Sequence, residues 1–334
     1  MNTKRIISLV ASLALVLSLS VGLTGCGDKT AQDDSQNSTD GEGAKYTVGI
    51  CQLVQHEALD AATQGFIDAL NEALPGQVEF QNKNASGDSA NCSTIVNGFV
   101  SDGVDLIMAN ATAALTAAAA ATSDIPILGT SITAYGVALD IDDFNGTVGG
   151  NISGTSDLAD LEAQANMITE WFPDAQKVGL LFCSAEPNSV YQSDVVKAEL
   201  EKSGVAVSVY TFADSNDVAA VTATACDEND VLYIPTDNTA ASCTEAINNV
   251  AEPAGVPIIA GEEGICSGCG VATLSISYYD LGVTTGKMAA KILTGESNIS
   301  EMPIEYYPDP VKKYNPTICK ALGITVPEDY VAIG

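Results

Sequence analysis

Polar side chains follow almost every short apolar segment of the chain that could form a buried strand. Hydroxyls, amides and carboxylates gathered at the carboxyl ends of such strands can hold the head group of a polar ligand. Helix capping is the alternative, because Thr112, Asn188 and Asp237 each precede a predicted helix and their residue types favour that position. For the set as a whole we predict a ligand site, formed by Gln55, His56, Leu59, Asn110, Thr112, Ser131, Thr133, Glu186, Asn188, Ser189, Tyr191, Asp237, Asn238 and Glu262.

Two carboxylates and the single histidine carry the most specific hypotheses. Asp237 and Glu262 each follow a predicted strand, where a carboxylate could pair with a ligand ammonium. The alternatives are a helix N-cap for Asp237 and a loop charge for Glu262. His56 lies on the loop after the first predicted strand and could contact a ligand, face solvent or cap a helix.

The nine cysteines raise the question of metals and disulfides. Cys51 and Cys183 fall in predicted strands and are expected to be small buried hydrophobic side chains. Cys266 and Cys269 form a Cys-x-x-Cys pair, which could be a zinc half-site, a redox pair or a disulfide; we favour free thiols. No second such pair and no histidine pair could complete a zinc site, so we expect no metal and no cofactor.

The charge of the chain excludes several classes of function. With 43 acidic residues against 13 Lys and Arg, the net charge is −30, which repels polyanions and argues against nucleic-acid binding. Arg5 is the only arginine, so no guanidinium is available later in the chain to pair with a phosphate or carboxylate. A Ser-His-Asp triad would have to use His56.

The first 44 residues differ from the rest. Lys4 and Arg5 precede an apolar run from Ile6 to Val21, which is shorter than the roughly 20 residues of a membrane-spanning helix. The run leads to Leu23-Thr-Gly-Cys26, which resembles the bacterial lipoprotein signal, so residues 1–25 are predicted to be a signal peptide with Cys26 as the lipidated residue. The alternatives are an ordinary secretory signal and an uncleaved anchor. Residues 26–44 carry almost no apolar side chains and are predicted to be a disordered tether that holds the protein at the extracytoplasmic face of the cell membrane.

Strands and helices are predicted to alternate from Tyr46 onward. The predicted strands are 46–53, 77–82, 104–109, 125–129, 177–183, 205–212, 230–234 and 256–260, and the predicted helices are 57–74, 89–101, 112–122, 157–172, 188–203, 216–226 and 239–252. This alternation indicates an α/β fold of parallel sheets with helices on both faces. The cycle occurs twice, and the Gly- and Ser-rich segment 146–156 between the two halves suits a hinge. A ligand would then bind between two doubly wound lobes, beyond the strand ends.

Several motifs resemble a known family, in family order. They are Val48–Asp60 with Gly65-Phe66, Asn84-Ala85, Ile125–Ile127, Ser184–Ser189, Tyr233–Asn238, Tyr278–Gly282 and Gly323–Pro327. Together they resemble the tryptophan/tyrosine-type ABC transporter substrate-binding proteins. Two departures bear on the rim of the cleft: Ala134-Tyr135 stands where the family often has Asp-Pro, and Cys266 and Cys269 lie in a loop that usually lacks cysteine.

The resemblance implies a type I periplasmic-binding-protein clamshell with three crossovers. Residues 45–153 and 262–295 are then expected to form lobe I, and residues 154–261 and 296–334 lobe II. It also implies an aromatic amino acid or a close relative as the ligand. The ligand carboxylate would meet neutral donors on Thr112, Ser131, Thr133, Asn188 and Ser189, and its ring would meet Leu59, Tyr135 or Tyr191. Its ammonium group would pair with Asp237 or, as the second choice, with Glu262.

The expected function is capture of a small molecule for an ABC permease and ATPase by a monomeric lipoprotein that is not an enzyme. One alternative is a ligand-sensing accessory receptor for a signalling partner. A cleft hydrolase that pairs Ser184 or Ser189 with His56 is another, but the chain has no Gly-x-Ser-x-Gly motif.

Overall fold

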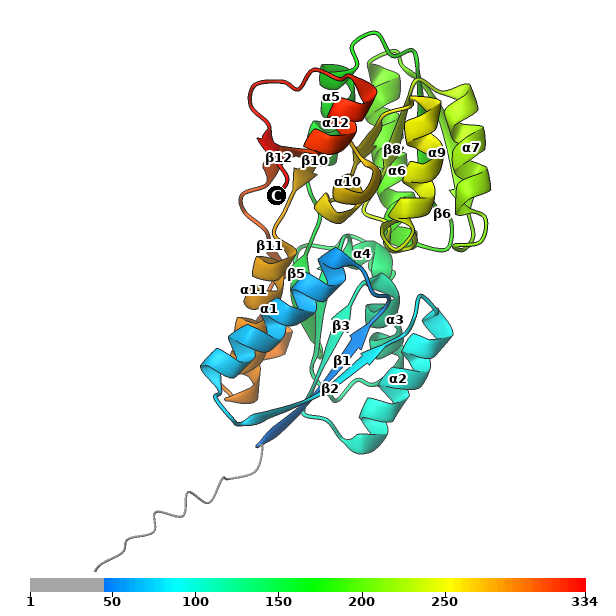
Figure 1. The fold of residues 1–334 in the computed structure, drawn as a ribbon. Helices are drawn as coiled ribbons and strands as arrows, with labels where there is room; N and C mark the ends of the chain where they lie inside the picture. Colours follow the sequence, from blue (N-terminus) through cyan, green and yellow to red (C-terminus); the bar gives the residue numbers. More distant parts are fainter. Residues whose placement is uncertain (1–44) are drawn as a thin grey trace, which may run out of the picture. The chain divides into compact units, whose positions relative to one another are not determined.

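The computed structural model describes residues 45–334 (Figure 1). The predicted signal peptide, the lipidation at Cys26 and the predicted tether lie outside the described residues. Within them, no helix combines the length and the apolar composition needed to cross a bilayer.

The first lobe is built on a six-stranded sheet in the order β11-β5-β4-β3-β1-β2. All of its neighbouring strands are parallel. Helices cover both faces, so β3 and β4 are buried along their whole length. The strands are β1 (Tyr46–Gln52), β2 (Val78–Asn84), β3 (Leu106–Asn110), β4 (Ile127–Ile132), β5 (Ile152–Ser156) and β11 (Glu305–Tyr306); the helices are α1 (Glu57–Ala73), α2 (Ser89–Asp102), α3 (Thr112–Ala121), α4 (Tyr135–Ala138), α11 (Tyr278–Leu293) and the 3₁₀ turn Ile299–Glu301.

The second lobe is built on a seven-stranded sheet in the order β13-β12-β10-β9-β8-β6-β7. Its neighbours are parallel except for β10 and β12. The strands are β6 (Lys177–Cys183), β7 (Ala206–Phe212), β8 (Val231–Ile234), β9 (Ile258–Ala260), β10 (Ala272–Ser275), β12 (Val311–Tyr314) and β13 (Val331–Ala332); the helices are α5 (Leu161–Trp171), α6 (Pro187–Lys202), α7 (Val218–Glu228), α8 (Asn238–Ala241), α9 (Thr244–Ala254), α10 (Glu263–Cys269) and α12 (Pro316–Leu322). The α/β class with two mainly parallel sheets is therefore confirmed.

Three segments cross between the sheets, at 157–160, 276–277 and 307–310. The division of the chain differs from the expected one at two places. β10 pairs with β9 and thereby places Glu263–Ser275 in the second lobe, and β11 pairs with β5 and thereby places Glu305–Tyr306 in the first. The expected hinge at 146–156 also differs, since Ile152–Ser156 form the buried inner strand β5. Gly154 has φ +143°, and a Cβ there would lie 2.0 Å from the Gly129 carbonyl oxygen. Glycine at position 154 thus allows a close approach of two strands.

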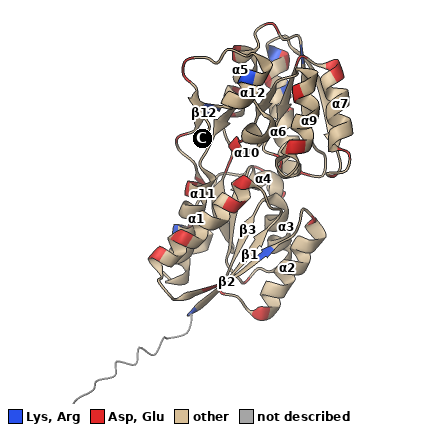
Figure 2. Ribbon diagram, in the orientation of Figure 1, with Lys and Arg blue, Asp and Glu red and all other residues tan. Residues whose placement is uncertain are grey.

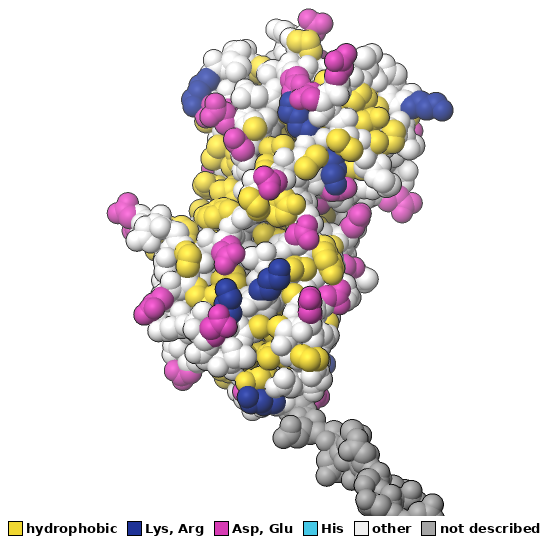
Figure 3. Space-filling view, turned by 90° about the vertical axis from the view of Figure 1, so that its left-hand side faces the viewer, with side chains coloured by type: hydrophobic (Ala, Val, Ile, Leu, Met, Phe, Trp, Pro, Cys, Tyr) yellow, Lys and Arg dark blue, Asp and Glu magenta, His cyan; other side chains and the backbone are white. Residues whose placement is uncertain are grey.

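All eight cysteines of the described residues are free thiols. Cys51 and Cys183 are buried in β1 and β6, as predicted, and Cys266 and Cys269 are buried in α10. Figure 2 shows acidic residues on helices of both lobes, with few lysines among them. Figure 3 shows apolar side chains on the face near α11 and β11, where Tyr279 and Tyr306 are exposed.

Helices α1 and α11 cross at very short range. A Cβ on Gly282 would lie 2.0 Å from the Ala62 carbonyl oxygen, and one on Gly65 would lie 2.1 Å from the Tyr279 carbonyl oxygen. Backbone oxygens cannot move aside as a flexible side chain can. These glycines therefore fix how closely α11 packs on the helix that begins beside His56.

We expect Gly282→Ala to lower the free energy of unfolding by about 1–3 kcal/mol, through overpacking at this crossing. Denaturant unfolding measures the change. Gly98→Ala is the matched control, because Gly98 lies in α2 and a Cβ added there would meet nothing within 4 Å, and it should stabilise the protein by roughly 0.5–1 kcal/mol. Equal effects of the two substitutions would contradict the close crossing.

Candidate functional site

A narrow cavity lies between the strand ends of the two lobes. Its lining residues come from the first lobe, from the crossovers and from the second lobe: His56, Leu59, Ser131, Thr133, Asp157, Asn188, Thr236, Asp237, Asn238, Ala241, Glu262 and Tyr278. The volume in which the centre of a water molecule fits is about 10 Å³. The cavity therefore has room for no more than about one water. A ligand larger than this enters only if the lobes or the lining side chains move.

Three buried polar atoms in the lining have no hydrogen-bond partner: His56 Nδ1, Ser131 Oγ and Asp157 Oδ1. Such atoms are costly unless something satisfies them. Ser131 also has φ +55°, an uncommon backbone conformation for a residue with a side chain. Their concentration in one cavity marks the place where a polar ligand would supply the missing hydrogen bonds.

His56 joins the two lobes through a hydrogen bond from its Nε2 to Asn238 Oδ1, at 3.2 Å. The Asn238 amide nitrogen donates to Glu186 Oε2 at 2.7 Å, so its oxygen must be an acceptor and His56 Nε2 must carry the proton. Burial lowers the pKa of His56 below its usual value, which keeps the ring neutral near pH 7. Nδ1 is therefore a bare acceptor.

Asp237 caps the four-residue helix α8. One carboxylate oxygen accepts from Ala240 N–H and the other from Cys183 N–H, each at 2.7 Å. Burial, and then the charge of Glu186, raise the pKa of Asp237 to about 8. Because both oxygens already have partners, the helix-cap alternative describes this side chain well.

Glu262 has the same kind of role at α10. Its oxygens accept from Gly264 N–H at 2.6 Å and from Ile265 N–H at 2.5 Å. Burial raises its pKa to about 7. Glu262 lines the cavity, but both of its oxygens serve the start of a helix.

Asp157 differs from these two carboxylates. It follows β5 directly and is 4% exposed. Its Oδ2 accepts from the Tyr278 hydroxyl at 2.9 Å, whereas its Oδ1 has no partner. Burial raises the pKa of Asp157 as well.

The structure brings eight of the predicted site residues together in the cavity: His56, Leu59, Ser131, Thr133, Asn188, Asp237, Asn238 and Glu262. The other six do not line it. Gln55 is exposed; Asn110 donates to the Leu59 carbonyl and to Thr63; Thr112 begins α3; Glu186 accepts from Asn238 and Thr239; Ser189 is buried in α6; and Tyr191 packs on the core of the second lobe. Tyr135, expected as a ring wall, is buried in the core of the first lobe.

Four residues that line the cavity are not among the predicted site residues: Asp157, Thr236, Ala241 and Tyr278. The signal for Asp157 was present, because it directly follows a strand. The Gly- and Ser-rich composition of residues 146–156 masks this signal, because it favours a hinge followed by a helix from 157, whereas the structure has β5 up to Ser156 and α5 from Leu161.

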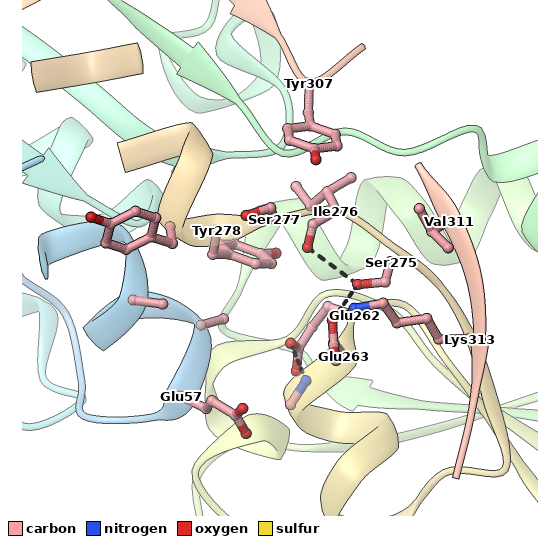
Figure 4. Close-up of a pocket in the computed structure, with 14 residues that line it drawn as sticks. Glu57, Glu262, Glu263, Ser275, Ile276, Ser277, Tyr278, Tyr307, Val311 and Lys313 are labelled. Carbon is pink, nitrogen blue, oxygen red and sulfur yellow. Dashed lines mark hydrogen bonds and ion pairs between the residues drawn. The ribbon is translucent and has the colours of Figure 1, made fainter. Parts of the chain in front are cut away.

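A larger pocket of about 250 Å³ adjoins the cavity at Glu262 and Tyr278 (Figure 4). In this pocket Glu263 Oε2 accepts hydrogen bonds from Lys313 Nζ at 2.6 Å and from the Ser275 hydroxyl at 2.7 Å. None of its lining residues carries one of the unpartnered buried atoms of the described chain. The smaller cavity is therefore the better ligand site.

The geometry gives no support to a hydrolase triad. His56 bonds to Asn238, whereas the Ser184 hydroxyl donates to the Phe212 carbonyl and Ser189 is fully buried. Among residues 45–334, no group of three or more His, Cys, Asp or Glu side chains could hold a metal ion.

Comparison with known proteins gives consistent matches over nearly the whole described chain. Residues 47–333 match the family model for ABC transporter substrate binding proteins. The chain is 34% identical over 312 residues to the tyrosine-binding protein of Clostridioides difficile, covering 91% of this chain and 88% of that protein.

Two solved structures are similar throughout. One is the ABC domain in complex with L-Trp from Streptococcus pneumonia, at 30% identity and a TM-score of 0.81, covering 85% of this chain and 97% of that one. The other is the ligand-free, open structure of a substrate binding protein with adhesive properties from Clostridium difficile. It has 34% identity and a TM-score of 0.65, and the match covers 86% of this chain and 99% of that one.

Proposed function

Because the chain belongs to the family of ABC transporter substrate-binding proteins, a family of binding proteins rather than enzymes, we propose that it captures an aromatic amino acid or a close relative. The ligand binds between the lobes and is delivered to a membrane permease with its ATPase. The observation that carries the proposal is the cavity in which His56 Nδ1, Ser131 Oγ and Asp157 Oδ1 all lack partners.

The proposed ligand class rests on the relatives and on the chemistry of the cavity. One relative is a tyrosine-binding protein and another is a complex with L-Trp. Neutral donors, foremost the unpartnered Ser131 hydroxyl, would meet the ligand carboxylate, because the described chain contains no arginine and no lysine lines the cavity. Leu59, Ala241 and the Tyr278 ring provide apolar surface for an aromatic side chain.

In this proposal the lobes part to admit the ligand. The TM-score is higher with the L-Trp complex than with the ligand-free, open relative, although the open relative is more identical in sequence. This difference supports a closed arrangement here, and it agrees with a cavity of about 10 Å³. The hydrogen bond from His56 to Asn238 joins the lobes and would break on opening, as in hinge closure around a ligand.

The proposal includes the location of the protein. The Leu-x-Gly-Cys sequence at Leu23–Cys26 favours a lipid anchor on Cys26. Diacylation of this cysteine would supply the more than one acyl chain that stable membrane attachment takes. The protein would then act as a monomer on the extracytoplasmic face of the cell membrane, next to its permease. Membrane fractionation of a Cys26→Ala variant tests this part.

Native purification followed by denaturation and mass spectrometry of the released small molecules tests the ligand class. We expect an aromatic amino acid, or its hydroxy- or keto-acid relative, to be enriched over a matched purification of an unrelated protein. A ligand added back at ~100 times its dissociation constant should stabilise the fold by about 2.7 kcal/mol. Release of a sugar or polyol instead, with no thermal shift from any aromatic amino acid, would contradict the proposal.

A further inference from the structure

The cavity contains three carboxylates, and they are not equivalent. Asp237 and Glu262 each use both oxygens to accept backbone N–H groups at the start of a helix. A ligand ammonium would have to share or displace those bonds. Asp157 accepts from Tyr278 at Oδ2, and the neighbouring Thr133 side chain also favours its ionised form; Oδ1 keeps no hydrogen-bond partner.

The unused oxygen of Asp157 is buried and without a partner. A carboxylate in such a place is unfavourable unless a positive group or further donors reach it. The only histidine in the lining is a neutral acceptor, and no lysine lines the cavity. An ammonium group on the ligand would supply the missing positive charge.

Asp157 is also held in place for this role. The Tyr278 hydroxyl fixes Oδ2 at 2.9 Å and so leaves Oδ1 for another donor. Asp157 lies on the first crossover, and Tyr278 begins α11 directly after the second. A ligand group bound to Asp157 would therefore sit where the two lobes are connected.

We propose that Asp157, and not Asp237 or Glu262, is the carboxylate that pairs with the ammonium group of the ligand. This assignment rests on the proposed function and deepens it, because it selects α-amino acids over their desamino relatives. A ligand without the ammonium leaves Oδ1 of Asp157 buried and unpaired.

Calorimetric titration of the purified protein with L-tyrosine, L-tryptophan and 3-(4-hydroxyphenyl)propanoate tests the assignment. We expect Asp157→Asn to weaken binding of the two amino acids roughly 100-fold or more, since it removes one partner of a desolvated charge pair. Binding of the propanoate should change by less than about fivefold. The preference for the amino acid over its desamino relative should therefore collapse.

Asp160→Asn is the matched control, because Asp160 is an exposed N-cap of α5 only three residues away, and its affinities should match those of the wild type. If Asp157→Asn does not fold, Tyr278→Phe keeps the charge and removes only the 2.9 Å hydrogen bond; it should weaken amino-acid binding more than propanoate binding.

Native affinity of Asp157→Asn for the amino acids would overturn the assignment while leaving the proposed function intact. So would an equal loss of affinity for all three compounds in Tyr278→Phe. Failure of the wild type to bind any aromatic amino acid would instead overturn the proposed function, and the assignment with it.

Discussion

Asp237→Ala is expected to lower the free energy of unfolding by about 2–4 kcal/mol and to leave the affinity for an aromatic amino acid within roughly threefold of the wild type. The substitution removes the cap bond to Ala240 N–H, which is worth about 1 kcal/mol. It also leaves Cys183 N–H buried without its 2.7 Å acceptor, which costs about 1–3 kcal/mol more. Denaturant unfolding and calorimetric titration of the same sample separate the two effects.

Asp217→Ala is the matched control for this experiment. Asp217 is also an N-cap, of α7, but its side chain makes no cap hydrogen bond and is exposed, so its effect should stay within about 0.5 kcal/mol. Native stability of Asp237→Ala with a hundredfold loss of affinity would show that Asp237 contacts the ligand.

The stability of the ligand-free protein is expected to fall by a few kcal/mol as the pH rises from about 5 to 8. Burial raises the pKa of Asp237 to about 8 and that of Glu262 to about 7. Both values lie well above the values of roughly 4 in the unfolded chain. The folded state therefore binds more protons over this range, and its advantage is lost as the pH rises through the folded pKa values.

Urea unfolding at a series of pH values measures this slope. The net charge of −30 contributes with the same sign, because self-repulsion grows as acidic groups ionise. The double variant Asp237→Asn, Glu262→Gln removes the contribution of these two buried carboxyl groups. The free energy of unfolding of this variant should depend clearly less on pH than that of the wild type. A wild type that becomes more stable between pH 5 and 8 would contradict the raised pKa values.

Most strands and helices could be predicted because their signal is local. Segments such as 106–109 in β3 and Val231–Ile234 are apolar throughout, since helices cover both faces of each sheet. The strand Ile152–Ser156 was missed because its glycine, serine and threonine residues are typical of a flexible join. In the structure, Gly154 allows the close approach to β4, and Thr155 bonds to Thr130 of β4 and to Thr285 of α11.

The candidate site could be predicted only in part, for a related reason. A polar residue after a strand is easy to find, but whether its atoms are free depends on neighbours that are distant in the sequence. Cys183 occupies one oxygen of Asp237 from 54 positions away, whereas Asp157 keeps an oxygen unpaired. Nothing local distinguishes these two carboxylates.

The measurement that tests the central claim most directly is calorimetric titration of the purified wild-type protein with L-tyrosine, L-tryptophan and, as a non-aromatic comparison, L-leucine. We predict saturable binding of one molecule of at least one aromatic amino acid per chain, with a higher melting temperature, and much weaker binding of leucine. Absence of both heat and thermal shift with every aromatic amino acid would contradict the claim that the cavity around His56, Ser131 and Asp157 holds such a ligand.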